Sequence, residues 1–350
     1  MSHTSTHRIM LDGVDEQLIE LSPLEFARAL EVPTLIRVPG AGVSAPRGFA
    51  CLLHGDESTG LEAALQVLRR RRQWPFDLWI VVGNVPAAIA DGGFEHRYLP
   101  GQEDFNRIWG NDGADSPQRV AAAAILDELS DVGMDAMVDI HNNTGDNPFY
   151  AIVTTDKPGD YNLATLFTTT ILRWNLGVAT LMEGMPADVP AIAIECGLPG
   201  LPESRAFALD GLRRFLGVRR FRNDHVRIDV DVFGDMVKVK VPRDLDFAIG
   251  GDLGGRDFVV ADGADHLNFV RIPAGHVIGR VPPGNPVPLI AETASGKIVT
   301  HERLAVTPEG LVTTRHSEIP VMMTRTVAAA RHDVLLYLAD RLPPPGGVPD

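Results

Sequence analysis

The sequence predicts an α/β fold with a mainly parallel, mixed sheet flanked by helices, followed by a smaller C-terminal β module. Between about residues 34 and 215, short apolar runs alternate with segments of helical periodicity. Such alternation is typical of parallel strands joined by covering helices. After about residue 222 the pattern changes, because residues 227–241 alternate apolar and polar side chains and Gly and Pro recur up to residue 288. That second pattern indicates short antiparallel strands.

The elements expected in the first part follow one another as strand and helix. The predicted strands are residues 48–53, 78–82, 134–140, 148–154 and 191–194, and the predicted helices are residues 59–72, 117–129, 161–174 and 201–216. The helix at 59–72 is predicted because its apolar residues recur at positions 61, 64, 65 and 68. Pro117 suits the first turn of the next helix. Residues 84–115 form a long stretch rich in Gly, Asp and Asn, and such loops are usually functional.

A chain of 350 residues exceeds the usual size of a single core. We expect an α/β domain over residues 1–220, a β-rich module over 221–322 and a C-terminal part over 323–350. The last part is predicted to hold a helix at about 325–341 and a disordered tail rich in Pro and Gly.

Composition excludes several classes of partner. The formal net charge is −14, which argues against nucleic acid and against an anionic membrane as partners.

Cys51 and Cys196 lie in apolar strand-like runs, so buried thiols are expected rather than a disulfide framework. The N-terminus has no apolar export signal and no apolar stretch approaches ~18 residues, so we expect a cytoplasmic protein. The sequence does not determine the oligomeric state, and a homo-oligomer is one of the alternatives.

Three polar residues stand at the carboxyl ends of predicted strands. They are His54, His141 and Glu195, and this edge is where an open parallel sheet binds ligands. Glu57 follows His54 by three residues, so one turn brings both side chains to one side. A His-x-x-Glu pair with a distant His is a common ligand set for a catalytic zinc that keeps one position open. Alone, the pair would suit a helix cap or the surface, and His141 would suit a core; together they predict a metal site.

Four motifs in order carry a resemblance to a known family. Residues 54–60 (HGDESTG) are similar to the HG-N-E motif of the succinylglutamate desuccinylase/aspartoacylase family, within the zinc carboxypeptidase superfamily. Residues 83–110 resemble its stretch from GNP-x-A through a lone Arg to DLNR. Residues 138–145 (VDIHNNTG) resemble its D-L-H, and residues 194–200 (IECGLPG) its strand-end Glu followed by Gly. The resemblance covers about residues 48–215.

The resemblance implies one Zn²⁺ per chain, held by His54, Glu57 and His141. Asp104 would orient a zinc histidine and set its tautomer. Glu195 would be the general base that takes a proton from zinc-bound water and later passes it to the departing amine.

The resemblance also implies three residues that act on the substrate. Arg97 would stabilise the tetrahedral oxyanion, although a surface arginine is the alternative and its spacing to Arg107 is two residues longer than in the family. Asn106 and Arg107 would hold the substrate's carboxylate, for which a planar guanidinium is better suited than an ammonium. Asp56 stands where the family usually has Asn. Glu183 is the other acidic residue considered for the role given to Glu195, and we expect it to lie in a loop.

The function implied is that of a zinc-dependent amidohydrolase that cleaves the amide of a small, carboxylate-bearing N-acyl amino acid or a related amide. The first alternative is a metallocarboxypeptidase acting on a peptide C-terminus, because the same carboxylate clamp would serve it. The second is a non-catalytic zinc- or ligand-binding protein on the same scaffold. Residues 182–193 contain no Lys or Arg, so a second substrate carboxylate is not expected, and neither is a strict aspartoacylase or succinylglutamate desuccinylase.

Overall fold

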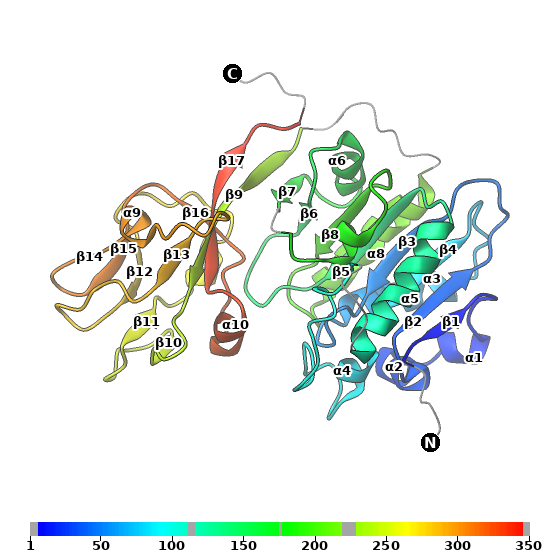
Figure 1. Ribbon diagram of the computed structural model, residues 1–350, viewed down its shortest axis with the longest axis horizontal. Helices are drawn as coiled ribbons and strands as arrows, with labels where there is room; N and C mark the ends of the chain where they lie inside the picture. Colours follow the sequence, from blue (N-terminus) through cyan, green and yellow to red (C-terminus); the bar gives the residue numbers. More distant parts are fainter. Residues whose placement is uncertain (1–5, 111–115, 175–176, 219–228, 346–350) are drawn as a thin grey trace. The chain divides into compact units, whose positions relative to one another are not determined.

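The computed structural model of the chain describes residues 6–110, 116–174, 177–218 and 229–345 (Figure 1). The chain forms two compact units. The first consists of Met1–Asn142, Phe149–Asp231 and Pro343–Asp350, and the second of Asn143–Pro148 and Val232–Leu342. The two units are divided at other positions than residues 220 and 322, because a short segment after residue 142 and residues 323–342 both belong to the second unit. The expected domain limits stay a prediction.

The first unit contains a mixed sheet with the strand order β1-β2-β4-β3-β5-β8-β6-β7. Its strands are β1 (Arg8–Met10), β2 (Thr34–Val38), β3 (Arg47–Cys51), β4 (Leu78–Val82), β5 (Ala136–His141), β6 (Tyr150–Val153), β7 (Thr170–Arg173) and β8 (Ala191–Glu195). Only β2/β4 and β6/β8 pair antiparallel. The predicted mainly parallel sheet is therefore confirmed.

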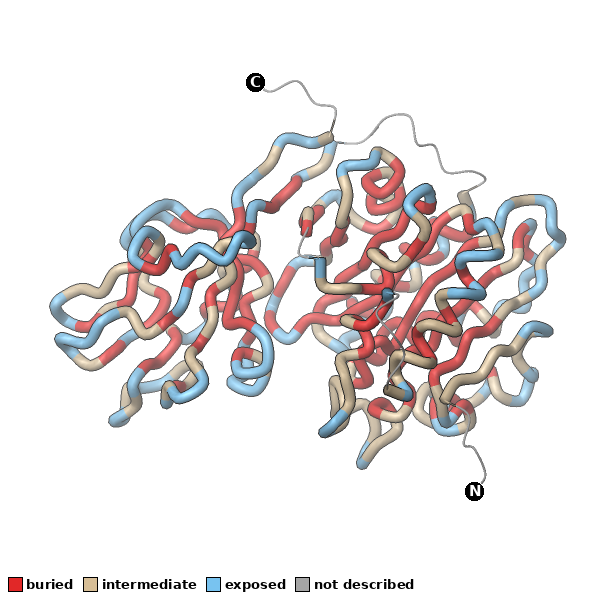
Figure 2. The backbone as a smooth tube through the Cα atoms, in the orientation of Figure 1, coloured by how far each residue is buried: buried red, intermediate tan, exposed pale blue. Residues whose placement is uncertain are grey.

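Helices flank this sheet (Figure 1). They are α1 (Glu16–Ile19), α2 (Pro23–Leu30), α3 (Thr59–Arg69), α4 (Val85–Ile89), α5 (Pro117–Asp131), α6 (Pro158–Ala164), α7 (Leu181–Gly184) and α8 (Pro202–Gly217). Strands β3, β4, β5 and β8 are buried along their whole length, and Figure 2 shows them as the centre of the unit. Burial on both faces explains why these strands are apolar runs rather than alternating patterns.

Three expectations for this unit were wrong in part. The helix predicted at 161–174 is replaced by α6 and then β7. Thr168, Thr169, Thr170 and Ile171 are β-branched, which disfavours a helix, and β7 pairs in parallel with β6. The stretch at 84–115 is not wholly irregular, because α4 begins after Asn84, whose side chain accepts a hydrogen bond from Ala87 N. Glu183 lies in α7 rather than in a loop, and its carboxylate accepts from Thr180 N at 3.0 Å.

The second unit is a β module with two groups of strands. The first group is a five-stranded sheet with the order β10-β11-β12-β15-β14. In the second group, β9 pairs antiparallel with β13 and with β17, and β17 pairs antiparallel with β16. The elements are β9 (Asp231–Lys240), β10 (Phe247–Ile249), β11 (Phe258–Val260), the 3₁₀ helix η1 (Ala264–Leu267), β12 (Val277–Arg280), β13 (Ile290–Glu292), α9 (Thr300–Arg303), β14 (Leu304–Val306), β15 (Leu311–Thr314), β16 (Ile319–Val321), α10 (Val327–His332) and β17 (Leu336–Leu342). The predicted C-terminal β module is confirmed.

The helix predicted at 325–341 was wrong in its second half. Helix α10 ends at His332, and residues 336–342 form β17 along β9. Leu336 and Leu338 are buried in one apolar cluster with Val237 and Val239 of β9. This long-range pairing overrides the helix propensity of the Leu- and Ala-rich segment. Most of the predicted tail, residues 346–350, lies outside the described residues.

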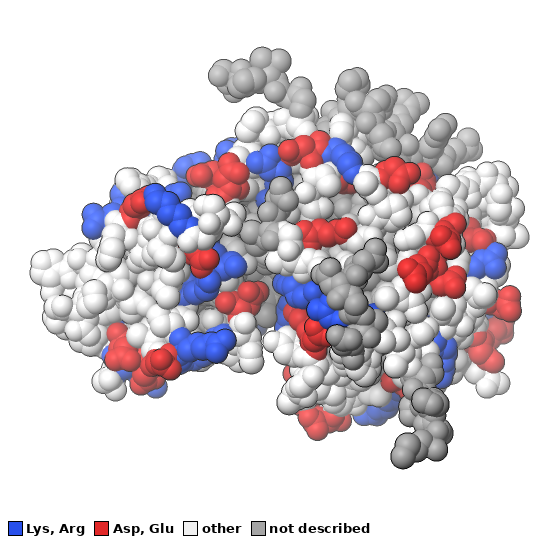
Figure 3. Space-filling model, in the orientation of Figure 1, with Lys and Arg blue, Asp and Glu red and all other residues white. Residues whose placement is uncertain are grey.

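Two features of the structure concern the charge of the surface and the length of the helices. Figure 3 shows Lys and Arg side chains scattered among Asp and Glu on the face in view. Within the part of the chain that the structure describes, no helix has both the length and the apolar character needed to cross a membrane.

Candidate metal centre

The sheet topology brings three predicted site residues to one edge. Strands β3, β5 and β8 are parallel neighbours, so their carboxyl ends meet. His141 is the last residue of β5 and Glu195 the last of β8, and the two are paired in register. His54 follows the end of β3 by three residues. The edge is the one at which open parallel sheets bind ligands.

The turn between β3 and α3 has an unusual backbone. Leu52 is fully buried and has φ 55°, in the left-handed region, a conformation that costs about 1–3 kcal/mol in a non-glycine residue. A Cβ on Gly55 would lie 2.5 Å from the backbone nitrogen of Ala88, so only glycine fits there. The tight turn directs the side chains of His54 and Glu57 to the same side.

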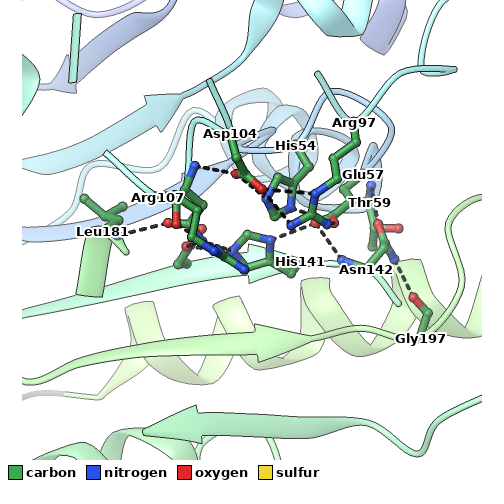
Figure 4. A network of polar contacts seen from close by, with 12 residues as sticks. His54, Glu57, Thr59, Arg97, Asp104, Arg107, His141, Asn142, Leu181 and Gly197 are labelled. Carbon is green, nitrogen blue, oxygen red and sulfur yellow. Dashed lines mark hydrogen bonds and ion pairs between the residues drawn. The ribbon is translucent and has the colours of Figure 1, made fainter. Parts of the chain in front are cut away.

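The three predicted zinc ligands converge on one point (Figure 4). Glu57 Oε1 lies 2.8 Å from His54 Nδ1, and Glu57 Oε2 lies 2.7 Å from His141 Nδ1. All three side chains are buried, and one ligand atom from each lies within 4.8 Å of the others. Two imidazole nitrogens and a carboxylate are a donor set that zinc takes in catalytic sites, so these residues could hold a metal.

The second nitrogen of each imidazole also lies against a carboxylate. His54 Nε2 is 3.0 Å from Asp104 Oδ1, and His141 Nε2 is 2.7 Å from Asp139 Oδ2. A carboxylate at Nε2 favours the tautomer with the proton there and leaves the Nδ1 lone pair for a metal. Asp139 was not among the predicted site residues. Its signal was present in the sequence, because residues two apart on a strand share a face.

Electrostatics favour positive charge between the two rings. Burial alone would lower the pKa of His141, but the carboxylates of Asp139 and Glu57 outweigh it and raise this pKa well above its usual value. For His54, burial and Arg97 lower the pKa, and Glu57 and Asp104 more than reverse the shift. Burial would raise the pKa of Glu57, but the two histidines hold it far below its usual range. A divalent cation would satisfy the same excess of buried carboxylates.

Glu195 differs from Glu57 and Asp104, whose pKa values are lowered. It is 7% exposed, and burial, with the nearby charge of Glu57, raises its pKa to about 8 against the opposing effects of His141, His54 and Arg97. A carboxyl group with such a pKa can accept and release a proton near neutral pH. Glu195, the predicted general base, thus lies beside the three possible ligands, and its pKa is raised whereas that of Glu57 is lowered.

The two predicted arginines lie in or next to the site. Arg97 donates from Nε and Nη2 to Asp104 Oδ2 at 3.2 and 3.0 Å, and its Nη1 lies 3.8 Å from Glu57 Oε1. Arg107 donates from Nη1 to the carbonyl oxygen of Asn106 at 2.8 Å. Burial would raise the pKa of Asp104, but His54, Arg97 and Arg107 hold it far below its usual range. Arg97 therefore contacts Asp104 and lies near Glu57 while 32% of its side chain stays exposed, and its role stays a prediction.

Asn106 is held by contacts within the protein. Its Oδ1 accepts from Leu181 N at 2.9 Å, and its Nδ2 donates to Asp139 Oδ2 at 3.3 Å. The loop at 104–107 therefore supports both histidines, because Asp104 contacts His54 while Asn106 contacts the partner of His141. Substrate binding by Asn106 stays a prediction that these contacts do not test.

Two further residues adjoin the site. Asn142, missed by the sequence analysis, donates its backbone N–H to Glu57 Oε2 at 3.0 Å. Its side chain donates to Gly197 O at 2.8 Å and accepts from Thr59 N at 3.3 Å. Asp56 has a buried Oδ1 with no hydrogen-bond partner among the described residues. Burial and Glu57 raise the pKa of Asp56, with His54 and Arg97 opposing.

Comparisons with known proteins address the fold. The sequence matches no family model and no curated protein. Among solved structures, murine aminoacylase 3 superposes with a TM-score of 0.56 at 17% identity, covering 86% of this chain and 96% of that one. Succinylglutamate desuccinylase from Chromobacterium violaceum gives a TM-score of 0.53 at 18% identity, covering 84% and 98%. The succinylglutamate desuccinylase/aspartoacylase from Rhodobacter sphaeroides gives 0.57 at 15% identity, covering 88% and 89%. The chain therefore has the fold of the succinylglutamate desuccinylase/aspartoacylase family.

Proposed function

We propose that the protein is a zinc-dependent hydrolase that cleaves the amide bond of a small N-acyl amino acid or a related amide. One observation carries the proposal. The Nδ1 atoms of His54 and His141 both face the carboxylate of Glu57, while each Nε2 lies against a further carboxylate. Ligands oriented in this way by hydrogen-bonded partners are typical of metal sites. The proposal includes one zinc ion per chain.

The remaining residues supply what amide hydrolysis needs. A bound zinc ion would lower the pKa of water toward ~7 and polarise the substrate carbonyl. Glu195 takes the proton of the attacking water and returns it to the nitrogen of the leaving amine. Arg97 donates hydrogen bonds to the oxygen that becomes negative during attack. Arg107 binds the carboxylate of the substrate, and Asn106 orients the loop that carries Arg107.

The substrate class rests on the names of the structural relatives and on the local charge. An aminoacylase, a desuccinylase and an aspartoacylase all share the fold, which supports an N-acyl amino acid as substrate. Residues 182–193, just before Glu195, contain no Lys or Arg. A second carboxylate on the substrate would lack a cation from this segment, so we favour a substrate other than N-acetylaspartate or succinylglutamate.

The experiment that tests this proposal compares wild-type protein with Glu195→Gln. Metal analysis and turnover are measured on a panel of N-acyl amino acids and blocked dipeptides. We expect zinc in both proteins, and a loss of turnover of about 10²–10⁴-fold in the variant because the base is gone. Comparable turnover in the two proteins would refute the assignment of Glu195. Faster cleavage of blocked dipeptides would favour the carboxypeptidase alternative, and zinc binding without any turnover would favour the non-catalytic one.

A further inference from the structure

The segment Asn143–Pro148 follows the candidate metal ligand His141 by one residue, yet it belongs to the second unit. Its backbone groups are bonded by residues of that unit. The carbonyl oxygen of Thr144 accepts from Arg325 N at 3.3 Å, and Asp146 N donates to Asp265 Oδ2 at 3.0 Å. The segment has no helix or strand of its own. Its conformation therefore depends on these contacts, because buried backbone polar groups need partners.

Asn268 is the central contact of this segment. It is 5% exposed, and its Nδ2 donates to Asp146 O at 3.0 Å and to Met323 O at 3.1 Å. Its Oδ1 accepts from Met323 N at 2.7 Å. Both amide hydrogens and the carbonyl oxygen of the side chain are thus used. One buried amide ties the segment to the chain just before α10.

Two further features fix the same contact. A Cβ on Gly145 would overlap the carbonyl oxygen of Met323, so the two backbones approach more closely than any other residue would allow. Met322 has φ 54° and donates its N–H to Asn147 Oδ1 at 3.2 Å. A non-glycine residue keeps such a conformation only where its surroundings enforce it. The close approach at Gly145 and the strained backbone of Met322 indicate that the contacts around them hold the segment in one conformation.

The other end of the segment reaches the candidate metal centre along the chain. Asn142 immediately precedes it, and the backbone N–H of Asn142 donates to Glu57 Oε2 at 3.0 Å. His141 comes one residue earlier, with its Nδ1 2.7 Å from the same oxygen. A displacement of residue 143 would therefore move the N–H that orients one possible ligand and the backbone of another. Metal sites require ligands held within about 0.5 Å.

We propose that Asn268 is a positioning residue for the metal centre, and that holding the segment after His141 is a function of the second unit. The inference rests on the proposed function, because it assigns to the β module a task in metal binding. Asn268 acts through the backbone of Asp146 and Met323 and does not contact the ligands. Its removal leaves two carbonyl oxygens and one N–H without their partner and frees the segment.

The test uses Asn268→Ala in the full-length protein. The zinc dissociation constant is measured by competition with a chelator, and the visible spectrum of the Co²⁺-loaded protein reports ligand geometry. We expect zinc to bind about tenfold more weakly, as when other residues that support metal ligands are removed, and the Co²⁺ bands to shift. Hydrogen exchange in the metal-free protein should quicken across residues 142–147 and stay slow in β11 and β15.

The matched control is Val312→Ala in β15, a fully buried residue of the five-stranded sheet. It should lower the thermal midpoint and leave zinc affinity and the Co²⁺ spectrum unchanged. If Asn268→Ala behaves like this control, the inference is overturned. Should Asn268→Ala fail to fold, Asp265→Ala is the second variant, which removes the hydrogen bond from Asp146 N to Asp265 Oδ2. It should weaken zinc binding by a smaller factor, and wild-type affinity would again overturn the inference. Wild-type protein that binds no zinc would instead refute the proposed function, and this inference with it.

Discussion

Asp139 Oδ2 lies 2.7 Å from His141 Nε2, on the opposite side of the ring from the Nδ1 that faces Glu57. The two residues are two apart on β5, so the strand itself sets this contact. Asp139 is fully buried and also accepts from Asn106 Nδ2 at 3.3 Å. The contact favours the orientation of the imidazole in which Nδ1 faces Glu57 and is available to a metal.

Asp139→Asn is expected to weaken zinc binding by about 10–100-fold, because an amide accepts the Nε2 proton less strongly and can present its own N–H instead. Competition with a chelator measures the effect. Asp131→Asn, on the exposed end of α5, is the control and should bind zinc as wild type does. Equal affinity in all three proteins would show that Asp139 does not set the ligand geometry.

Gly55→Ala should disrupt the turn that carries His54 and Glu57. The added Cβ would lie 2.5 Å from Ala88 N and 2.7 Å from Ala87 Cβ, and such overpacking costs about 1–3 kcal/mol of unfolding free energy. Urea unfolding measures the loss, and zinc content measures the displacement of the ligands. Gly217→Ala is the control, because nothing lies within 4 Å of its Cβ position. A Gly55→Ala protein with wild-type stability and zinc content would contradict the geometry of the turn.

Arg97→Lys separates the proposed oxyanion contact from substrate binding. Lysine cannot reproduce the two-nitrogen contact that Arg97 makes with Asp104. We expect kcat to fall by about 10²–10³-fold with zinc retained, as for other donors to a developing negative charge. Arg71→Lys, whose side chain is 51% exposed, should be silent. A rise in KM with unchanged kcat would assign Arg97 to substrate binding instead.

Asp160 makes stability depend on pH. Burial raises the pKa of Asp160 above its ordinary value, while Thr155, Ala191 N and Lys157 oppose the shift. Because the folded-state pKa is the higher one, the buried carboxyl favours folding below its ordinary pKa, and this contribution is lost as the pH rises through the folded-state value.

Asp160→Asn should therefore gain stability relative to wild type as the pH rises from 4 to 8. The amide can still accept from Ala191 N and can donate to Thr155 Oγ1, the group that now donates to the carboxylate. Urea unfolding at several pH values measures the difference in unfolding free energy. A difference that does not vary with pH, or that moves against Asn as the pH rises, would contradict the raised pKa.

The parts of the fold that could be predicted are those with a local signal. Residues 78–82 are a continuous apolar run, and β4 has the predicted limits. His54, His141 and Glu195 could be grouped without a structure, because parallel strands bring their carboxyl ends to one edge. The strand β17 could not be predicted, since its Leu-rich sequence suits a helix and only pairing with β9 decides the matter.

The parts of the site that were missed depend on long-range contacts. The hydrogen bond from Asn106 to Asp139 spans 33 residues, and that from Asn268 to Asp146 spans 122. No local periodicity reports such pairs. Asp139 is the exception, because its position two residues before His141 on a predicted strand was enough to suggest a shared face.

The most direct measurement of the central claim is an anomalous-scattering map at the zinc edge from crystals of the zinc-loaded protein. We predict one peak per chain, about 2.0–2.2 Å from His54 Nδ1, His141 Nδ1 and a carboxylate oxygen of Glu57. A peak next to these three atoms would support the account. A peak bound by other residues, or no peak at these atoms in zinc-loaded crystals, would contradict it.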